Sequence, residues 1–73
     1  MAAKPIHRRV LGEAIRTARK AVGYSQEKLA EKADLHPNYI GEVERGEKTI
    51  SVDALVRVAK ALKVRLSALV EDI

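Results

Sequence analysis

The side chains that could carry out a chemical reaction are few in this chain of 73 residues. His7 and His36 are its two histidines, cysteine is absent, and no His-Glu-x-x-His or other close ligand spacing occurs. Ser25, Asp34 and His36 match a catalytic triad by residue type, but Ser25 is better explained as a helix cap. A chain of this length also has little room for a substrate cleft. The sequence therefore favours a protein that is not an enzyme and that holds neither a metal ion nor a cofactor.

Hydrogen-bonding residues gather instead around a tight turn between two short predicted helices. The hydroxyl of Ser25 is suited to cap the first helix, and Asp34 tolerates the turn geometry that ends it. Pro37 suits the first position of the second helix because its missing N–H is not needed there, and Gly46 can close that helix in a left-handed conformation. The second helix is thus expected over about residues 37–45. Two helices joined in this way form the unit whose second helix enters the major groove of DNA.

The segments on both sides of this turn also read as helices, because their apolar residues recur with a helical period. We expect a first helix from Val10, a fourth helix that ends near Leu62 and a short fifth helix from about Leu66. No segment alternates between apolar and polar residues for long enough to predict a strand. The sequence thus predicts an all-α fold of five helices, with residues 1–9 as a flexible basic N-terminal arm and residues 10–73 as a single domain.

Composition and charge limit the partners that the chain can have. The formal net charge is +4, but residues 1–24 carry six basic side chains against one carboxylate, whereas residues 25–49 carry four basic and six acidic side chains. A basic total suits nucleic acid, yet the predicted pair of helices is itself acidic, so phosphate contacts must come from a few placed residues. No apolar run approaches the ~18 residues of a membrane span, and no signal peptide is recognised. We therefore expect a cytoplasmic protein that does not bind membranes.

Four short motifs resemble those of the Cro/repressor (Xre-type) helix-turn-helix transcription regulators, over about residues 10–70. The motifs are I-R-x-x-R, S-Q-x-x-L-A, E-R-G and A-x-A-L, seen here as Ile15, Arg16 and Arg19; Ser25, Gln26, Leu29 and Ala30; Glu44, Arg45 and Gly46; and Ala59, Ala61 and Leu62. Within the family, the segment LHPNYIGEVERGEKTIS looks most like the small controller proteins of restriction–modification systems. The resemblance implies a lambda-repressor-like DNA-binding domain with a central helix-turn-helix.

A DNA-binding set is expected at the start of the two central helices and in the loop that follows them. The set comprises Gln26, His36, Pro37, Asn38, Tyr39, Glu42, Arg45, Lys48 and Thr49. Gln26 is either a good helix former or, as in the family, a group that meets a phosphate. Asn38 is either a solvated polar side chain or an amide that pairs in bidentate fashion with adenine N6 and N7. Phosphate contact is expected from at least one of Arg45, Lys48 and Thr49.

Other members of the set have alternative roles. Tyr39 either lies over the domain surface or touches a thymine methyl group or a phosphate. Glu42 either accepts a hydrogen bond from a cytosine amino group or stays solvated. For Pro37, a structural role at the start of the helix is favoured over contact with DNA. Arg8 and Arg9 belong to the predicted arm, where they are expected to be disordered without DNA and could touch the DNA backbone or the minor groove.

Two structural features complete the expectations. Arg19 matches a family position whose guanidinium pairs with the glutamate that matches Glu44, so we expect a partly buried salt bridge between them. The last helix offers Leu66, Leu69 and Val70, which is more apolar surface than one short helix can bury against its own domain. We therefore predict that these three residues form a dimer interface, with part of the stripe also covering the core of the domain.

The function predicted from the sequence is a sequence-specific, DNA-binding transcription regulator that acts as a homodimer on a roughly palindromic operator. Its partners are then double-stranded DNA and a second copy of itself, and no small-molecule ligand is expected. The alternative is an antitoxin-like protein-interaction module that neutralises a partner protein. Such a module usually needs an extra segment that wraps its partner, and this chain offers only the short arm and the tail.

Overall fold

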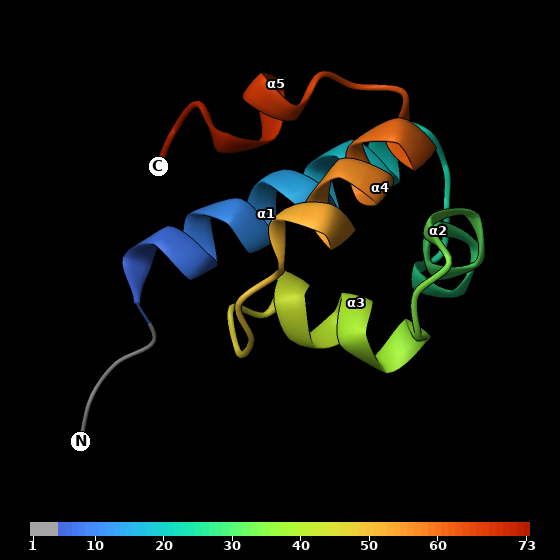
Figure 1. Cartoon of the computed structure of the whole chain (residues 1–73), viewed down its shortest axis with the longest axis horizontal. Coiled ribbons are helices and arrows are strands. Elements are labelled where there is room, and N and C mark those ends of the chain that lie inside the picture. The colour runs from blue at the N-terminus through green and yellow to red at the C-terminus, as the bar shows by residue number, and fades with distance from the viewer. Residues whose placement is uncertain (1–4) are drawn as a thin grey trace.

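Residues 5–73 are described by the computed structural model, and they form five helices and no strand (Figure 1). In chain order the helices are α1 (Ile6–Ala21), α2 (Gln26–Ala33), α3 (Pro37–Glu44), α4 (Val52–Leu62) and α5 (Leu66–Val70). The predicted all-α class with five helices is confirmed. Helix α3 ends slightly earlier than expected, because Arg45 is its C-terminal cap rather than its last helical residue.

Local sequence explains where the middle helices begin and end. The hydroxyls of Ser25 and Ser51 each accept a hydrogen bond from a backbone N–H in the first turn of α2 and α4. The Nδ1 atom of His36 accepts a hydrogen bond from the N–H of Asn38 at 3.0 Å and so caps α3. Asp34 ends α2 in the left-handed region, at φ 56° and ψ 51°. These caps satisfy backbone groups that a helix end otherwise leaves without partners.

The predicted N-terminal arm is too long. Helix α1 begins at Ile6, so Arg8 and Arg9 are helical rather than part of a disordered tail. The carbonyl of Pro5, which caps the helix, accepts hydrogen bonds from the N–H groups of both arginines, at 3.1 and 3.3 Å. The prediction assumed that the first residues of a chain are poorly ordered, whereas arginine is a good helix former. Residues 1–4 of the predicted arm lie outside the described residues.

The core lies where α1, α2, α3 and α4 meet, and its largest fully buried side chains are Ile15, Leu29, Ile40, Leu62 and Val58. Helix α2 packs against both α3 and α4, and α1 packs against α3. Isolated helices of about this length are marginal in water, so this packing rather than helix propensity holds α2 and α3 in place. The exposed side of α3 is therefore presented on a rigid support.

Gly12 lets α1 and α3 approach closely. A Cβ atom at this position would lie 2.4 Å from the carbonyl oxygen of Val43 and 2.6 Å from that of Glu44. Only glycine fits such a contact without a shift of the backbone, so Gly12 fixes the distance between the middle of α1 and the end of α3. The sequence pattern does not single out this residue, because the contact joins segments that are far apart in the chain.

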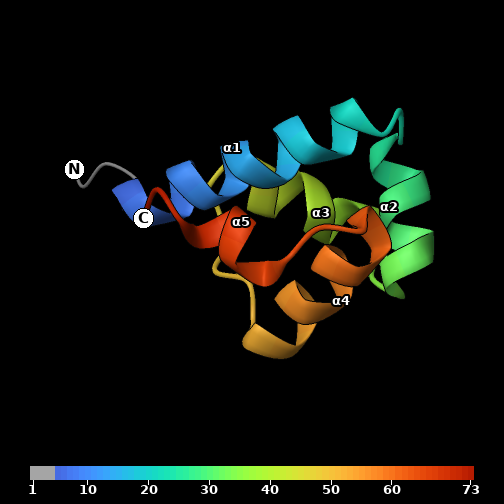
Figure 2. The same cartoon turned by 90° about the horizontal axis from the view of Figure 1, so that it is seen from above.

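Helix α5 lies against both α1 and α4 (Figure 2). Leu69 is only 3% exposed in the single chain, so it belongs to the core of its own domain. Its assignment to a dimer interface is therefore wrong: the apolar stripe of α5 is divided, and Leu69 is on the inner side. Leu66 is 37% exposed and Val70 is half-buried, so these two residues keep apolar surface on the outside of the domain.

Candidate nucleic-acid interface

A buried ion pair fixes the ends of α1 and α3 relative to each other. The Nε atom of Arg19 donates a hydrogen bond to Oε2 of Glu44 at 2.6 Å, and its Nη2 atom donates to Oε1 at 3.1 Å. Nη1 of the same guanidinium donates to the carbonyl oxygen of Tyr24 at 2.8 Å, which ties in the segment before α2. The salt bridge expected between these two residues is thus present, and both side chains are almost fully buried.

Gln26 joins this network from the first turn of α2. Its Nε2 atom donates a hydrogen bond to Oε1 of Glu44 at 3.1 Å. The amide is half-buried and oriented by the ion pair, so Gln26 is more than a residue with good helix propensity. Because Glu44 accepts from Arg19 as well, one carboxylate connects α1, α2 and α3 at the base of the candidate site.

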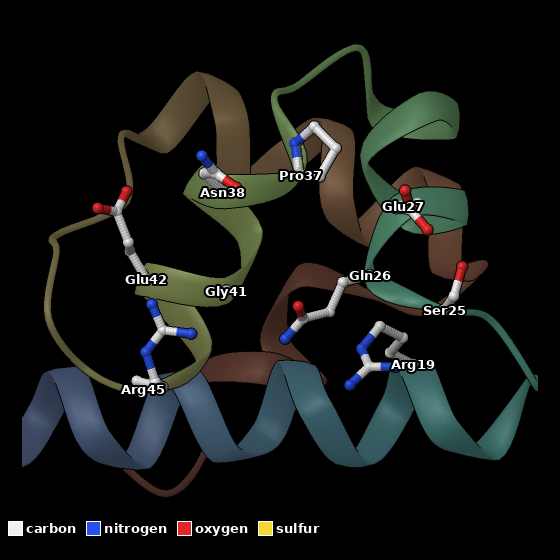
Figure 3. Close-up of a pocket in the computed structure, with 9 residues that line it drawn as sticks. All are labelled: Arg19, Ser25, Gln26, Glu27, Pro37, Asn38, Gly41, Glu42 and Arg45. Atoms are coloured by element: carbon white, nitrogen blue, oxygen red, sulfur yellow. The ribbon is translucent and has the colours of Figure 1, made fainter.

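A groove of about 680 Å³ lies between the first turn of α2 and the exposed side of α3 (Figure 3). The residues that line it are Arg19, Ser25, Gln26, Glu27, Pro37, Asn38, Gly41, Glu42 and Arg45. The structure therefore brings together five of the nine residues of the predicted DNA-binding set. Of the other four, Tyr39, Lys48 and Thr49 lie on α3 or in the loop after it, and His36 is the cap of α3.

The N-terminal turn of α3 faces solvent at this groove. Pro37 occupies the first helical position, Asn38 the second, and Asn38 is exposed. Because His36 uses its Nδ1 atom to cap the helix, its position is fixed by a structural role. The first turns of α2 and α3 both open onto this groove, and helix N-termini carry N–H groups and a partial positive charge that favour anions.

The cations on this surface are paired with carboxylates of the same chain. The Nε atom of Arg45 lies 2.9 Å from Oε2 of Glu47, and its Nη2 atom lies 3.2 Å from Oε1. This hydrogen bond with Glu47 raises the pKa of Arg45. The Nζ atom of Lys48 lies 3.6 Å from Oε1 of Glu42, so Glu42 is an ion-pair partner in the isolated protein. All four groups are at least partly accessible, and such pairs exchange readily for other anions.

Tyr39 shapes the loop after α3. Its hydroxyl donates a hydrogen bond to the carbonyl oxygen of Thr49 at 3.4 Å and accepts one from the N–H of Ser51 at 3.3 Å. The ring is half-buried against the core. Of the alternatives for Tyr39, the free protein has the one in which the side chain lies over the domain, where it holds the loop that carries Lys48.

Sequence reasoning allowed Arg8 and Arg9 a contact with DNA, but it did not expect a face of α1 to extend this surface. A second hollow of about 520 Å³ shares Gln26 and Arg45 with the groove and is otherwise lined by Arg9, Glu13, Arg16 and Glu44. The i, i+4 and i+7 spacing of Arg9, Glu13 and Arg16 places them on one face of a helix, a signal that becomes visible once α1 is started at Ile6. Arg8 lies nearby and donates to the carbonyl oxygen of Glu47 at 3.3 Å.

Other kinds of site find no support in the part of the chain that the structure describes. Residues 5–73 place no three His, Cys, Asp or Glu side chains so that they could hold a metal ion. Within the same range, no helix has the length and apolar character that a membrane crossing requires.

Comparisons with known proteins agree with this arrangement. A family model described as helix-turn-helix (HTH_3) matches residues 15–69. The control protein C.SmaI of Serratia marcescens is 42% identical over 60 residues, which are 82% of this chain and 71% of that protein. The control protein C.BamHI of Bacillus amyloliquefaciens is 41% identical over 59 residues, which are 80% of this chain and 73% of that protein. The crystal structure of the restriction-modification controller protein C.AhdI from Aeromonas hydrophila matches with a TM-score of 0.87 and 34% identity, over 89% of this chain and 98% of that chain.

Proposed function

The chain belongs to the helix-turn-helix family of DNA-binding transcription regulators, and we propose that it acts as a homodimer on a roughly palindromic operator. Helix α3 enters the major groove in this proposal, and the first turn of α2 meets the DNA backbone. The similar structure of C.AhdI is that of a restriction-modification controller protein, which supports a role of this chain in controlling genes of a restriction–modification system.

The observation that carries the proposal is that Gln26 and Asn38 line the same groove from the first turns of α2 and α3. The two helices are linked by the hydrogen bond from Gln26 to Glu44, and the ion pair with Arg19 holds that carboxylate in place. A phosphate beside Gln26 would be met by the positive end of α2, while the Asn38 amide has the donor and acceptor that match the major-groove edge of adenine. Contact with the DNA backbone is thus assigned to α2, and contact with the bases is assigned to α3.

The paired cations explain how an acidic helix pair can bind DNA. Arg45 and Lys48 are close to carboxylates in the free protein. Phosphate oxygens compete with Glu47 and Glu42 for these cations, so DNA binding replaces one anion by another instead of bringing an unpaired cation to the backbone. Arg9 and Arg16 extend the same surface along α1. The resulting contacts are to phosphates and do not depend on sequence.

Dimerisation is proposed through the outer side of α5. Leu66 is 37% exposed and Ile73 is 58% exposed, and Val70 keeps part of its surface outside the core. A two-fold axis beside α5 would let each of these side chains meet the same patch of a second copy. A small core built without Phe or Trp gains stability from such added burial.

The experiment that tests this function is selection of bound duplexes from a random library by the purified protein. We expect a two-fold symmetric consensus whose half-sites lie about 34–36 Å, or 10–10.5 bp, apart. The variant Leu66→Asp serves as the control for the dimer, because a monomer should enrich single half-sites weakly or not at all. A library that emerges without any consensus would exclude sequence-specific binding, and an asymmetric consensus would exclude the two-fold arrangement.

A further inference from the structure

A third groove, of about 390 Å³, lies away from the candidate DNA-binding surface. Its lining residues are Tyr24, Lys32, Ala33, Asp34, Arg57, Lys60, Ala61 and Lys63. Helix α4 begins beside the loop that follows α3 and ends on the other side of the domain, beside α2 (Figures 1 and 2). The groove is at this far end of α4, and it shares no residue with the groove between α2 and α3. We call it the α2–α4 groove.

The rim of the α2–α4 groove is basic, because four cations line it together with a single carboxylate, that of Asp34. Arg57, Lys60 and Lys63 come from α4 and its C-terminal cap, and Lys32 comes from the last turn of α2. Within residues 5–73, none of the ion pairs involves any of these four cations. This differs from the DNA-facing surface, where the basic groups of Arg45 and Lys48 are paired. These four cations outnumber the one carboxylate of the lining, so an anionic occupant would be attracted to the groove.

The floor of the α2–α4 groove is apolar. It is formed by the ring of Tyr24 and by Ala33 and Ala61. The ring of Tyr24 already attracts the Nζ atom of Lys32, which lies 5.6 Å from its centroid. A sugar–phosphate backbone would neutralise the rim but would leave this floor uncovered. A peptide segment that carries both carboxylates and a large apolar side chain would satisfy both parts of the groove.

We propose that the α2–α4 groove docks an acidic segment of a partner protein, with an apolar side chain of that segment seated on Tyr24, Ala33 and Ala61. Carboxylates of the segment then lie on the rim formed by Lys32, Arg57, Lys60 and Lys63. Because the two grooves have no residue in common, the protein holds DNA and this partner at the same time. The partner is thereby placed beside a chosen DNA site, which is a role that DNA binding alone does not supply.

The probe for this proposal is a synthetic twelve-residue peptide of Glu and Asp that contains two Leu residues. A matched peptide of equal charge has Ser in place of both Leu, and a duplex that lacks the operator serves as the competing polyanion. Binding is followed by amide chemical shifts of the ¹⁵N-labelled full chain. We expect the Leu peptide to shift Tyr24, Ala33 and Ala61 and to bind about tenfold more tightly than the Ser peptide, a difference typical of one buried apolar anchor.

Charge reversal supplies the second readout. The double variant with Lys32→Glu and Lys60→Glu should lose at least about tenfold in affinity for the Leu peptide. Its melting temperature should equal that of the wild type, and its affinity for the operator should stay within about twofold of the wild-type value. The matched control reverses Lys20 and Arg65, which are exposed cations outside the groove, and therefore has the same net charge. This control should keep its affinity for the peptide.

Three results would overturn the proposal. The first is the absence of shifts in the α2–α4 groove at millimolar peptide. The second is equal affinity for the Leu and Ser peptides, because the apolar floor would then have no role. The third is a loss of binding to the non-operator duplex by the Lys32→Glu, Lys60→Glu variant with peptide binding unchanged, which would make the groove a second DNA contact.

Discussion

The guanidinium of Arg19 and the carboxylate of Glu44 meet at 2.6 Å in the interior, although 25 residues separate them in the chain. Each has further partners, because Arg19 also donates to the carbonyl oxygen of Tyr24 and Glu44 also accepts from Gln26. A carboxylate at this end of α3 that faced DNA without a cationic partner would be repelled by phosphates. Turned inward, it instead connects the end of α3 to Arg19 of α1 and to Gln26 in the first turn of α2.

Removal of one partner of this pair should be costly. Arg19→Ala or Glu44→Ala would leave the other charge buried and unpaired, so we expect the free energy of unfolding to fall by about 3–5 kcal/mol. The measurement is urea denaturation followed by circular dichroism. Glu13→Ala is the matched control, since its ion pair with Arg16 is exposed and such pairs contribute about 0–1 kcal/mol. Equal effects of the buried and exposed substitutions would show that the pair does not hold α1 and α3 together.

Gly12→Ala should destabilise the fold even though alanine usually favours helices by up to about 1 kcal/mol over glycine. The new methyl group would lie 2.4 Å from the carbonyl oxygen of Val43, so α1 and α3 must move apart. Overpacking of this kind costs about 1–3 kcal/mol. Gly41→Ala is the control, because there the nearest group is the flexible end of Arg45, at 3.0 Å. If Gly12→Ala melted at a higher temperature than the wild type, the close approach would be incorrect.

Lys48→Ala should weaken binding to operator and random DNA by the same factor. The residue is expected to contact a phosphate once it leaves Glu42, and such contacts carry no sequence information. The slope of log K against log salt should become shallower by about 0.9 for each phosphate that is no longer neutralised, and a dimer has two such sites. Affinities at several salt concentrations for both kinds of DNA provide the test. A change in sequence preference with an unchanged salt slope would assign Lys48 to base contact instead.

Two leucines of α5 should respond differently to the same substitution. Leu69 is 3% exposed, so Leu69→Asp places a charge in the core and should unfold the domain. Leu66 is 37% exposed, so Leu66→Asp should leave the fold intact and give a monomer. Sedimentation velocity together with circular dichroism separates the two outcomes. A wild-type protein that sediments as a monomer at high micromolar concentration would rule out the proposed dimer.

The sequence predicted those parts of the structure that depend on neighbouring residues. The caps at Ser25 and His36 and the left-handed turn at Asp34 follow from local chemistry, and the family resemblance read from short motifs is confirmed by the helix-turn-helix family match over residues 15–69. The same local reasoning did not detect that Lys63 ends α4 in the left-handed region, at φ 59°. Nothing in the side chain of lysine favours that conformation.

The features that the sequence did not predict depend on tertiary packing. The role of Gly12 requires knowledge of which carbonyl oxygens lie above it. The division of α5 into a buried Leu69 and a partly exposed Leu66 depends on how that helix lies against α1 and α4. The helical start of α1 was missed because Arg8 and Arg9 lie near the chain terminus and were assigned to a flexible arm. These arginines, read as part of a helix, would have extended the candidate interface from the beginning.

Asn38 is proposed to read an adenine in the major groove, and a chemical change in the DNA provides the test of this role. Each adenine of the selected half-site is replaced in turn by 7-deazaadenine, which lacks the N7 acceptor but keeps the base pair. Affinities of the wild type and of Asn38→Ala are then compared. We expect the wild type to lose about 1–3 kcal/mol at one adenine in each half-site, and Asn38→Ala to be insensitive to that same replacement. Equal losses for the two proteins at every adenine would contradict the account.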